Sequence, residues 1–245
     1  MDLKEQNWKN FTVNHLRDWH GIWTRYSPEG EVKESFQSLR SFRSNPEQTE
    51  IYHTNRYIYA DGRIEEKNWQ YDKQSMRGFF FEQGAAVLSG KQLESGAVLP
   101  HELLLKHEDI RHSVALIYDS NGSLMRAVSI REDAAGFPSK YWSKEINLLP
   151  ERNLSGNWQG TAVTMTPDLK VSEPIATQLH WPLAGNKMFF FPDGISLSCP
   201  EQVNIGTSFN IAANWLVTDS QLQQLRVNYD NYGAFSGLTL ELFHL

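Results

Sequence analysis

A stretch near the N-terminus recurs in the second half of the chain, and this repeat constrains the fold more than any other feature. The run Trp19–Val32 aligns without a gap on Trp158–Val171. Both runs begin with a tryptophan and a glycine two places on, then share a proline, an acidic residue and a closing valine. One such echo is common in β proteins and would indicate little by itself.

Further echoes follow in the same order, which indicates internal duplication. Phe79–Gly84 matches Phe189–Gly194, and Tyr118–Gly122 matches Tyr229–Gly233. The first copy is longer between its first two markers. The extra segment, Ile51 to Tyr71, is rich in aromatic residues and turns at an Asp-Gly pair, which predicts an inserted β-hairpin.

Short runs of alternating or β-branched residues, separated by turn residues, predict strands through most of the chain. Helical spacing of apolar residues occurs only in residues 2–18, where we expect a short helix that braces one end of a barrel. In the first copy, strands are expected at Gly21–Tyr26, from Val32 to near the Asn45-Pro46 break, and at Ile51–Tyr59, Arg63–Tyr71, Phe79–Leu88, Leu103–Lys106, Ser113–Tyr118 and Leu124–Ile130. In the second copy, they are expected at Trp158–Met165, Val171–Trp181, Lys187–Phe191, Ile195–Cys199, Phe209–Leu216, Leu222–Tyr229 and Phe235–Phe243.

This pattern predicts an all-β protein of two tandem antiparallel barrels with a short N-terminal helix. Breaks in the strand pattern between residues 133 and 153 place the boundary near Leu149. We therefore expect a first domain at 1–148, which carries the extra hairpin, and a smaller second domain at 149–245. Trp142 or Ile146 should lie in an apolar interface between them.

Composition excludes several classes of function. The 245 residues carry a net charge of −6 and show no basic stripe, so nucleic acid is a poor partner. No run approaches the roughly 20 apolar residues of a membrane helix, and the N-terminus lacks the pattern of a secretory signal. The single cysteine, Cys199, is expected to be a small buried residue, which fits a cytoplasmic protein.

Several motifs together resemble a known family. They are Trp19-His20-Gly21 with Tyr26–Glu31, Arg131-Glu132 after an Asn-Gly hairpin, Pro192–Ser196 with Cys199-Pro200, and Trp215-Leu216 before Gln224–Arg226 and Tyr229-Asp230. They resemble a cyanobacterial and plastid calycin-like (lipocalin-like) family of unknown function, domain of unknown function 3598. That family is similar in fold to phycobiliprotein lyases, barrels that hold a linear tetrapyrrole. The functional motif of the lyases is not found here, so the resemblance does not imply their activity.

No motif indicates a metal or an organic cofactor, and we expect neither. Phosphate loops, dinucleotide fingerprints and nucleophile elbows are absent from the sequence. His101, His107 and His112 lie near acidic residues, but their spacing does not bring two of them onto one face of a strand within reach of a metal. We interpret them as surface or turn histidines.

Candidate ligand-binding residues come from the first copy. Arg40 and Arg43 should face opposite sides of a strand, as should Arg131 and Glu132, so one member of each pair should point inward. An inward arginine either pairs with an internal glutamate or anchors a ligand carboxylate, with Arg43 or Arg131 as the candidate anchor. Further candidates are Trp23, Tyr57 and Trp69, as walls, and Tyr118 and Glu132, as polar or acid–base groups.

The sequence therefore predicts a binding protein for a hydrophobic or amphipathic small molecule with a carboxylate, such as a tetrapyrrole or a fatty-acid-like compound. One alternative is an enzyme that uses the same pocket, either a bilin lyase or a cyclase that works by confinement and an acid–base residue. Another is a structural protein whose barrels are filled by side chains and whose surface contacts an unknown protein partner.

Overall fold

The described part of the chain folds into one helix and two antiparallel sheets, which confirms the predicted all-β class and short N-terminal helix. The structure was obtained as a computed structural model that describes residues 2–154, 156–181 and 185–245. Helix α1 spans Leu3–His15. The first sheet has the order β4-β3-β2-β1-β9-β8-β7-β6-β5 and the second has the order β11-β10-β16-β15-β14-β13-β12.

The first sheet contains β1 (Asp18–Tyr26), β2 (Val32–Ser44), β3 (Glu50–Ile58), β4 (Ile64–Asp72), β5 (Phe79–Phe80), β6 (Ala86–Ser89), β7 (Leu99–His107), β8 (Ile110–Tyr118) and β9 (Leu124–Asp133). The second contains β10 (Gln159–Met165), β11 (Ile175–Gln178), β12 (Lys187–Phe190), β13 (Ile195–Cys199), β14 (Phe209–Thr218), β15 (Gln221–Tyr229) and β16 (Phe235–His244). The strand expected at Val171–Trp181 is shorter than predicted. Part of the reason is that Val171 forms only an isolated bridge to Met165 before the chain reaches β11.

The duplication predicted from the three echoes is visible in the strand order. Without β3 and β4, the first sheet reads β2-β1-β9-β8-β7-β6-β5, and each strand corresponds in order to one of the second sheet. The expected hairpin is β3 and β4, which extend the first sheet at one edge and have no counterpart in the second.

Contacts between the two sheets are reciprocal. Tyr118 donates a hydrogen bond from its hydroxyl to the Pro200 carbonyl at 2.8 Å, and its counterpart Tyr229 donates one to the Gly90 carbonyl at 2.5 Å. The same exchange holds for the backbone: Val203 donates to Gly122 at 2.9 Å, while Leu93 donates to Gly233 at 2.7 Å. Such two-way exchange is the pattern of an isologous interface between two copies of one unit.

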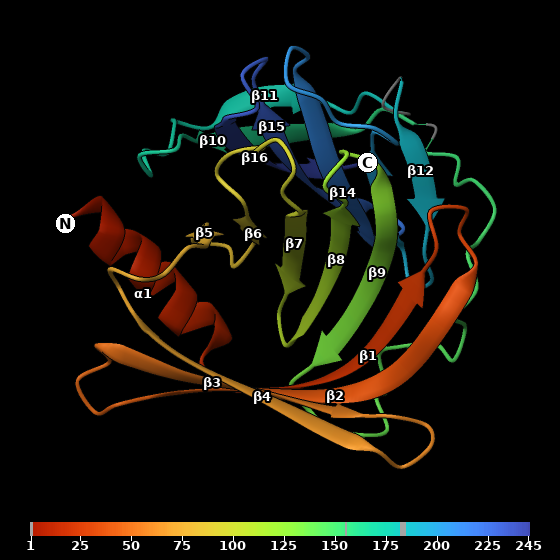
Figure 1. The fold of residues 1–245 in the computed structure, drawn as a ribbon. Coiled ribbons are helices and arrows are strands. Elements are labelled where there is room, and N and C mark those ends of the chain that lie inside the picture. The colour runs from red at the N-terminus through yellow and green to blue at the C-terminus, as the bar shows by residue number, and fades with distance from the viewer. Residues whose placement is uncertain (1, 155, 182–184) are drawn as a thin grey trace.

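One apolar core lies between the sheets. It joins buried side chains of β7 and β8, such as Leu103 and Leu116, to side chains of β13 and β14, such as Leu197 and Ile211. Trp142, between the sheets in sequence, contacts the rings of His112 and Trp215 at 5.5 and 6.2 Å, as expected for an interface residue. The second sheet thus covers the outer face of β7 and β8 and leaves the opposite face free to form a separate interior (Figure 1).

Helix α1 covers the edge of the first sheet at β5. Asn7 exchanges hydrogen bonds with the Gly78 carbonyl at 2.9 Å and the Phe80 amide at 2.8 Å, and Asn10 donates to the Phe80 carbonyl at 2.8 Å. These side chains pair with backbone groups that an exposed edge strand would leave open. Trp8 and Phe11 pack with Phe80 inside the first sheet, so the helix braces one end of it as predicted.

Candidate functional site

A cavity of about 640 Å³ lies inside the curl of the first sheet. The two ends of this sheet, β4 and β5, do not pair with each other, and residues 73–78 span the gap. Its lining residues come from strands far apart in sequence, such as β3, β4 and β7. Figure 1 shows β3 and β4 passing below α1 and β7. The lining comprises Phe11, His15, Trp23, Arg40, Phe42, His53, Asn55, Tyr57, Trp69, Gln70, Tyr71, Ser75, Met76, Arg77, Gly78, Phe80, Leu88, Glu102, Leu104 and Arg111.

Aromatic rings form a large part of the cavity wall. Trp23 meets Tyr57 edge-on, with ring centroids 5.3 Å apart. His53 stacks on Phe42 with centroids 4.3 Å apart and lies 4.8 Å from the ring of Trp69. These side chains come from β1, β2, β3 and β4, so alternation along each strand places them all on the concave face. Such a wall suits a flat or elongated apolar ligand.

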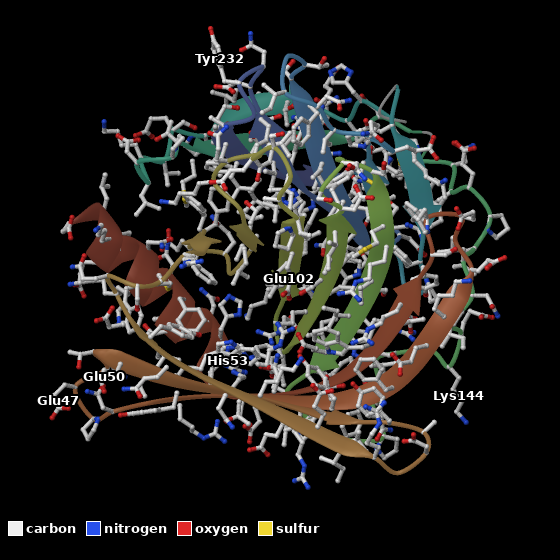
Figure 2. The ribbon with its side chains drawn as sticks, in the orientation of Figure 1. Glu47, Glu50, His53, Glu102, Lys144 and Tyr232 are labelled. Atoms are coloured by element: carbon white, nitrogen blue, oxygen red, sulfur yellow. The ribbon has the colours of Figure 1, made fainter. Side chains whose placement is uncertain are left out.

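Three buried charged side chains, Arg40, Arg111 and Glu132, form a network with the partly buried Glu102 at the inner end of the cavity. Arg40 donates a hydrogen bond from Nη1 to Glu102 at 3.0 Å, and its Nε lies 3.4 Å from Glu132. Arg111 donates from Nε to the other oxygen of Glu132 at 2.6 Å. Glu102 projects from β7 on the side of His53, which rises from β3 (Figure 2). Two guanidinium groups and two carboxylates therefore balance one another in a site shielded from water.

Burial and neighbouring charges act in opposite directions on this network: burial lowers the pKa of Arg111, while Glu132 acts to raise it. Burial acts to raise the pKa of Glu102, but Arg40 outweighs it and holds that pKa below its ordinary value. Burial lowers the pKa of His15, and the nearby charge of Arg111 lowers it further, so His15 is neutral. Its Nδ1 lies 3.3 Å from Nη1 of Arg111. The third nitrogen of Arg111, Nη2, is buried and has no hydrogen-bond partner among the described residues.

A chain of hydrogen bonds runs along the cavity face of β3. His53 Nε2 lies 2.7 Å from the Asn55 side-chain oxygen, and Asn55 donates from Nδ2 to the Tyr57 hydroxyl at 3.1 Å. Burial, with a further contribution from Arg40, lowers the pKa of His53 to about 3. His53 is therefore neutral near pH 7. Since Nε2 faces an oxygen, it carries the proton in this arrangement and Nδ1 keeps its lone pair.

The structure brings three of the sequence-predicted site residues together and places four elsewhere. Trp23, Tyr57 and Trp69 line the cavity. Arg43 binds Asp18 at 2.7 Å on the outer face of β2, and Arg131 binds Asp193 of the second half at 2.6 Å.

The remaining two lie outside the lining as well. Tyr118 is in the interface between the sheets, where its hydroxyl bonds to Pro200. Glu132 lies behind the lining, covered by the two arginines. Arginine and glutamate thus do form an internal pair, but the partners are Arg111 and Glu132 from neighbouring strands.

The prediction that the three histidines lie at the surface or in turns was wrong for His101 and His112. His101 is 2% exposed and His112 is fully buried, because both face the second sheet and not solvent. His101 lies edge-on to Tyr118 and Tyr229, and neither of its ring nitrogens has a hydrogen-bond partner among the described residues. His112 has its Nε2 2.9 Å from the Ser129 hydroxyl. Within the described part of the chain, no group of three or more histidine, cysteine or acidic side chains could hold a metal ion.

Arg77, Arg111, His53 and Glu102 were not singled out from the sequence as site residues. Alternation along β3 was the one available signal, because His53, Asn55 and Tyr57 share a face at every second position. Arg111 and Glu102 become recognisable only when β7 and β8 are placed in register with the rest of the sheet.

The fold and cavity define a class of protein: a mostly β protein of two related sheets in which one sheet encloses an aromatic cavity. The sequence matches the family described as "Domain of unknown function (DUF3598), N-terminal" over residues 4–137. Because this match spans more than half of the chain, the protein belongs to the DUF3598 family. Residues 183–242 also resemble the family described as "Biogenesis factor required for ATP synthase 1, C-terminal domain".

Comparison with solved structures agrees on the fold. A DUF3598-family protein of unknown function from Nostoc punctiforme PCC 73102 is 21% identical, with a TM-score of 0.81 over 97% of this chain and 98% of that chain. This likeness concerns the fold alone. Kievitone hydratase from Nectria haematococca covers 96% of this chain and 91% of its own at 7% identity, but its TM-score of 0.21 carries no argument. Comparison with curated proteins gave no match. Among the described residues, no helix is long and apolar enough to span a membrane.

Proposed function

We propose that the protein binds a hydrophobic or amphipathic small molecule that carries a carboxylate, of the tetrapyrrole or fatty-acid type, in a lipocalin-like pocket. The observation that carries this proposal is the cavity inside the first sheet. Its volume of about 640 Å³ falls within the range of roughly 300–1,000 Å³ that small-molecule sites occupy. A barrel filled by its own side chains would leave no such space, so the cavity favours binding over a purely structural role.

The composition of the lining supports an acidic ligand. Of the three lining arginines, Arg40 and Arg111 are balanced by Glu102 and Glu132, whereas Arg77 makes no ion pair within the described part of the chain. The remaining residues are mainly aromatic or aliphatic, with a few amide and hydroxyl groups. A ligand with an apolar body and a negatively charged group matches this distribution.

Binding can be tested with biliverdin and hexadecanoate, using quenching of tryptophan fluorescence and native mass spectrometry. Trp69→Ala removes one aromatic wall and should weaken the binding of biliverdin by about 5- to 30-fold, which corresponds to roughly 1–2 kcal/mol. Tyr52→Ala is the matched control, because Tyr52 is an exposed aromatic residue of β3 outside the cavity lining, and it should leave the affinity unchanged. If the parent protein takes up neither probe, the proposal fails.

An enzyme is the second candidate, favoured by the hydrogen-bonded chain of His53, Asn55 and Tyr57 on the cavity wall. The Tyr57 hydroxyl accepts the hydrogen bond from Asn55 and keeps its own proton to donate to a confined substrate, while His53 holds Asn55 in that orientation. His53→Gln should then retain binding while conversion of the bound molecule, followed by mass spectrometry, falls at least 100-fold. Return of every bound probe unchanged by the parent protein would exclude conversion of these probes and leave binding as the function.

A further inference from the structure

The buried charges at the inner end of the cavity are already neutralised, and this limits which end of a ligand can bind there. Arg40 and Arg111 face Glu102 and Glu132, two cations against two anions. All four side chains are largely withdrawn from water, with at most 20% of any of them exposed. A ligand carboxylate added here would leave a net negative charge in a poorly hydrated site, which is strongly unfavourable.

The same region nevertheless has buried hydrogen-bond donors without acceptors among the described residues. Nη2 of Arg111 and Nε1 of Trp23 are both buried, both belong to lining side chains, and neither has a partner among the described residues. Both side chains lie next to Arg40. Its guanidinium lies 5.2 Å from the Trp23 ring centroid, and it shares the carboxylate of Glu132 with Arg111. An indole or guanidinium N–H can only donate, so the matching ligand group is an uncharged oxygen acceptor. A carbonyl or hydroxyl satisfies these donors without adding charge.

The cation that can bind the carboxylate of the ligand is Arg77. Arg77 lines the cavity from the segment between β4 and β5, and its side chain is exposed. Within the described part of the chain, it makes no ion pair or hydrogen bond. A carboxylate bound at Arg77 would stay partly hydrated, so its desolvation is slight compared with burial beside Glu102. A guanidinium can also bind a carboxylate through two parallel hydrogen bonds.

Building on the proposed binding function, we propose that the ligand is held at both ends. A neutral carbonyl or hydroxyl lies at the inner end against Arg111 and Trp23, and a carboxylate lies at the mouth against Arg77. The aromatic wall covers the apolar body between them. The ligand class is a long apolar acid that is oxygenated at the end far from its carboxylate. Long-chain hydroxy or oxo acids and linear tetrapyrroles, which carry lactam carbonyls and propionates, share this chemistry.

The test uses hexadecanoate, 16-hydroxyhexadecanoate and the methyl esters of both as probes for the full-length protein. The parent should bind the hydroxy acid about 5- to 10-fold more tightly than hexadecanoate, and each acid more tightly than its ester by a similar factor. Arg77→Met should abolish the preference for acid over ester and keep the preference for the hydroxy acid over hexadecanoate. Arg56→Met is the matched control, since Arg56 is an exposed arginine of β3 that does not line the cavity, and both preferences should persist.

The inner end is tested with variants that should show the opposite pattern to Arg77→Met. Trp23→Phe keeps a ring in the wall and removes the N–H, so it should reduce the preference for hydroxyl and spare the preference for acid over ester. Arg111→Lys keeps the positive charge opposite Glu132 and should have the same effect. If Arg111→Lys fails to fold, as judged by circular dichroism, Trp23→Phe still tests whether the inner end recognises the hydroxyl group. Biliverdin and its dimethyl ester form a second arm: loss of the acid preference in Arg77→Met for this pair alone would identify the tetrapyrrole as the source.

Two outcomes separate this inference from the proposed function. If the parent binds hexadecanoate or biliverdin but binds each ester equally well, and Arg77→Met changes nothing, two-ended recognition is overturned while binding stands. If no probe binds at all, the proposed function fails together with the inference. A preference for hydroxyl that persists unchanged in Trp23→Phe and in a folded Arg111→Lys would overturn the assignment of the inner end.

Discussion

Replacing Glu132 by glutamine is expected to lower the free energy of unfolding by about 3–5 kcal/mol, the range measured when one partner of a buried ion pair is removed. Glu132 is fully buried and receives Arg111 at 2.6 Å and Arg40 at 3.4 Å. Without its charge, two buried guanidinium groups share Glu102 as their carboxylate. The glutamine side chain is almost the same size, so the change tests charge and not packing. Chemical denaturation at pH 7 measures it.

The control is the same substitution in an ion pair near the surface. Glu34 pairs with Arg25 at 2.6 Å, but both side chains are about one-third exposed. Glu34→Gln should cost no more than about 1 kcal/mol, since water screens the pair and solvates the remaining arginine. In addition, the double variant Arg111→Met with Glu132→Met should be less destabilised than the sum of the single variants, because no charge is left unpaired between them. Equal losses for Glu132→Gln and Glu34→Gln would contradict this account of the network.

The repeated Trp-x-Gly segment predicted the architecture because strand order follows from chain order in short antiparallel connections. Once Trp19, Phe79 and Tyr118 have counterparts in Trp158, Phe189 and Tyr229, the two sheets must share their order, and they do. The position of the hairpin followed from the extra length of the first copy. Alternation along the strands was also enough to suggest an aromatic wall, since every second residue of a strand faces one side.

The charged network could not be predicted in the same way. Alternation indicates that Arg131 and Glu132 face opposite sides, but it does not say which side encloses a cavity. The position of the second sheet decides which side this is. The second sheet covers the face of the first sheet that carries Arg131, and Asp193 of the second half binds Arg131 at 2.6 Å. The contact of Arg40 with Glu102 joins residues 62 positions apart, and it requires the complete register from β2 across β1, β9 and β8 to β7. The pattern of residues within a single strand carries no information about contacts between residues so far apart in the sequence.

The buried histidines were missed for a related reason. His101 and His112 stand in stretches rich in charged residues, which is typical of surface loops. Each nevertheless occupies the strand face that meets the second sheet, where Tyr118, Tyr229 and Trp215 surround the two rings. Their burial results from the docking of one half on the other and so has no signature within either half.

The burial of these rings predicts marked acid sensitivity of the fold. Burial lowers the pKa of His101 to about 3, and it also lowers the pKa of His112 and His15 well below the ordinary value, with nearby Arg131 and Arg111 adding to the effect. Below about pH 6.5, the unfolded chain binds a proton at each of these positions, whereas burial in the folded chain opposes protonation. Stability is therefore complete above that pH and falls as the pH decreases, by about 1.4 kcal/mol per unit for each histidine.

Between pH 7 and pH 5, a histidine whose pKa is lowered to about 3, as for His101 and His53, should lower the free energy of unfolding by about 2 kcal/mol, and His15 and His112 add to this loss. That is a large part of the roughly 5–15 kcal/mol that stabilises a typical domain. Urea denaturation at a series of pH values measures the loss directly. Glu102, with its lowered pKa, adds to it only below about pH 4.5.

His101→Phe isolates the contribution of one ring. Because neither nitrogen of His101 has a hydrogen-bond partner in the described part of the chain, phenylalanine fills the same space between Tyr118 and Tyr229 without breaking a hydrogen bond there. The variant should lose about 2 kcal/mol less than the parent between pH 7 and pH 5, and its unfolding should take up about one proton fewer. His180→Phe, at an exposed position, should keep the pH dependence of the parent. An unchanged slope in His101→Phe would mean that this ring is protonated in the folded protein, and that water or an acceptor reaches it between the two sheets.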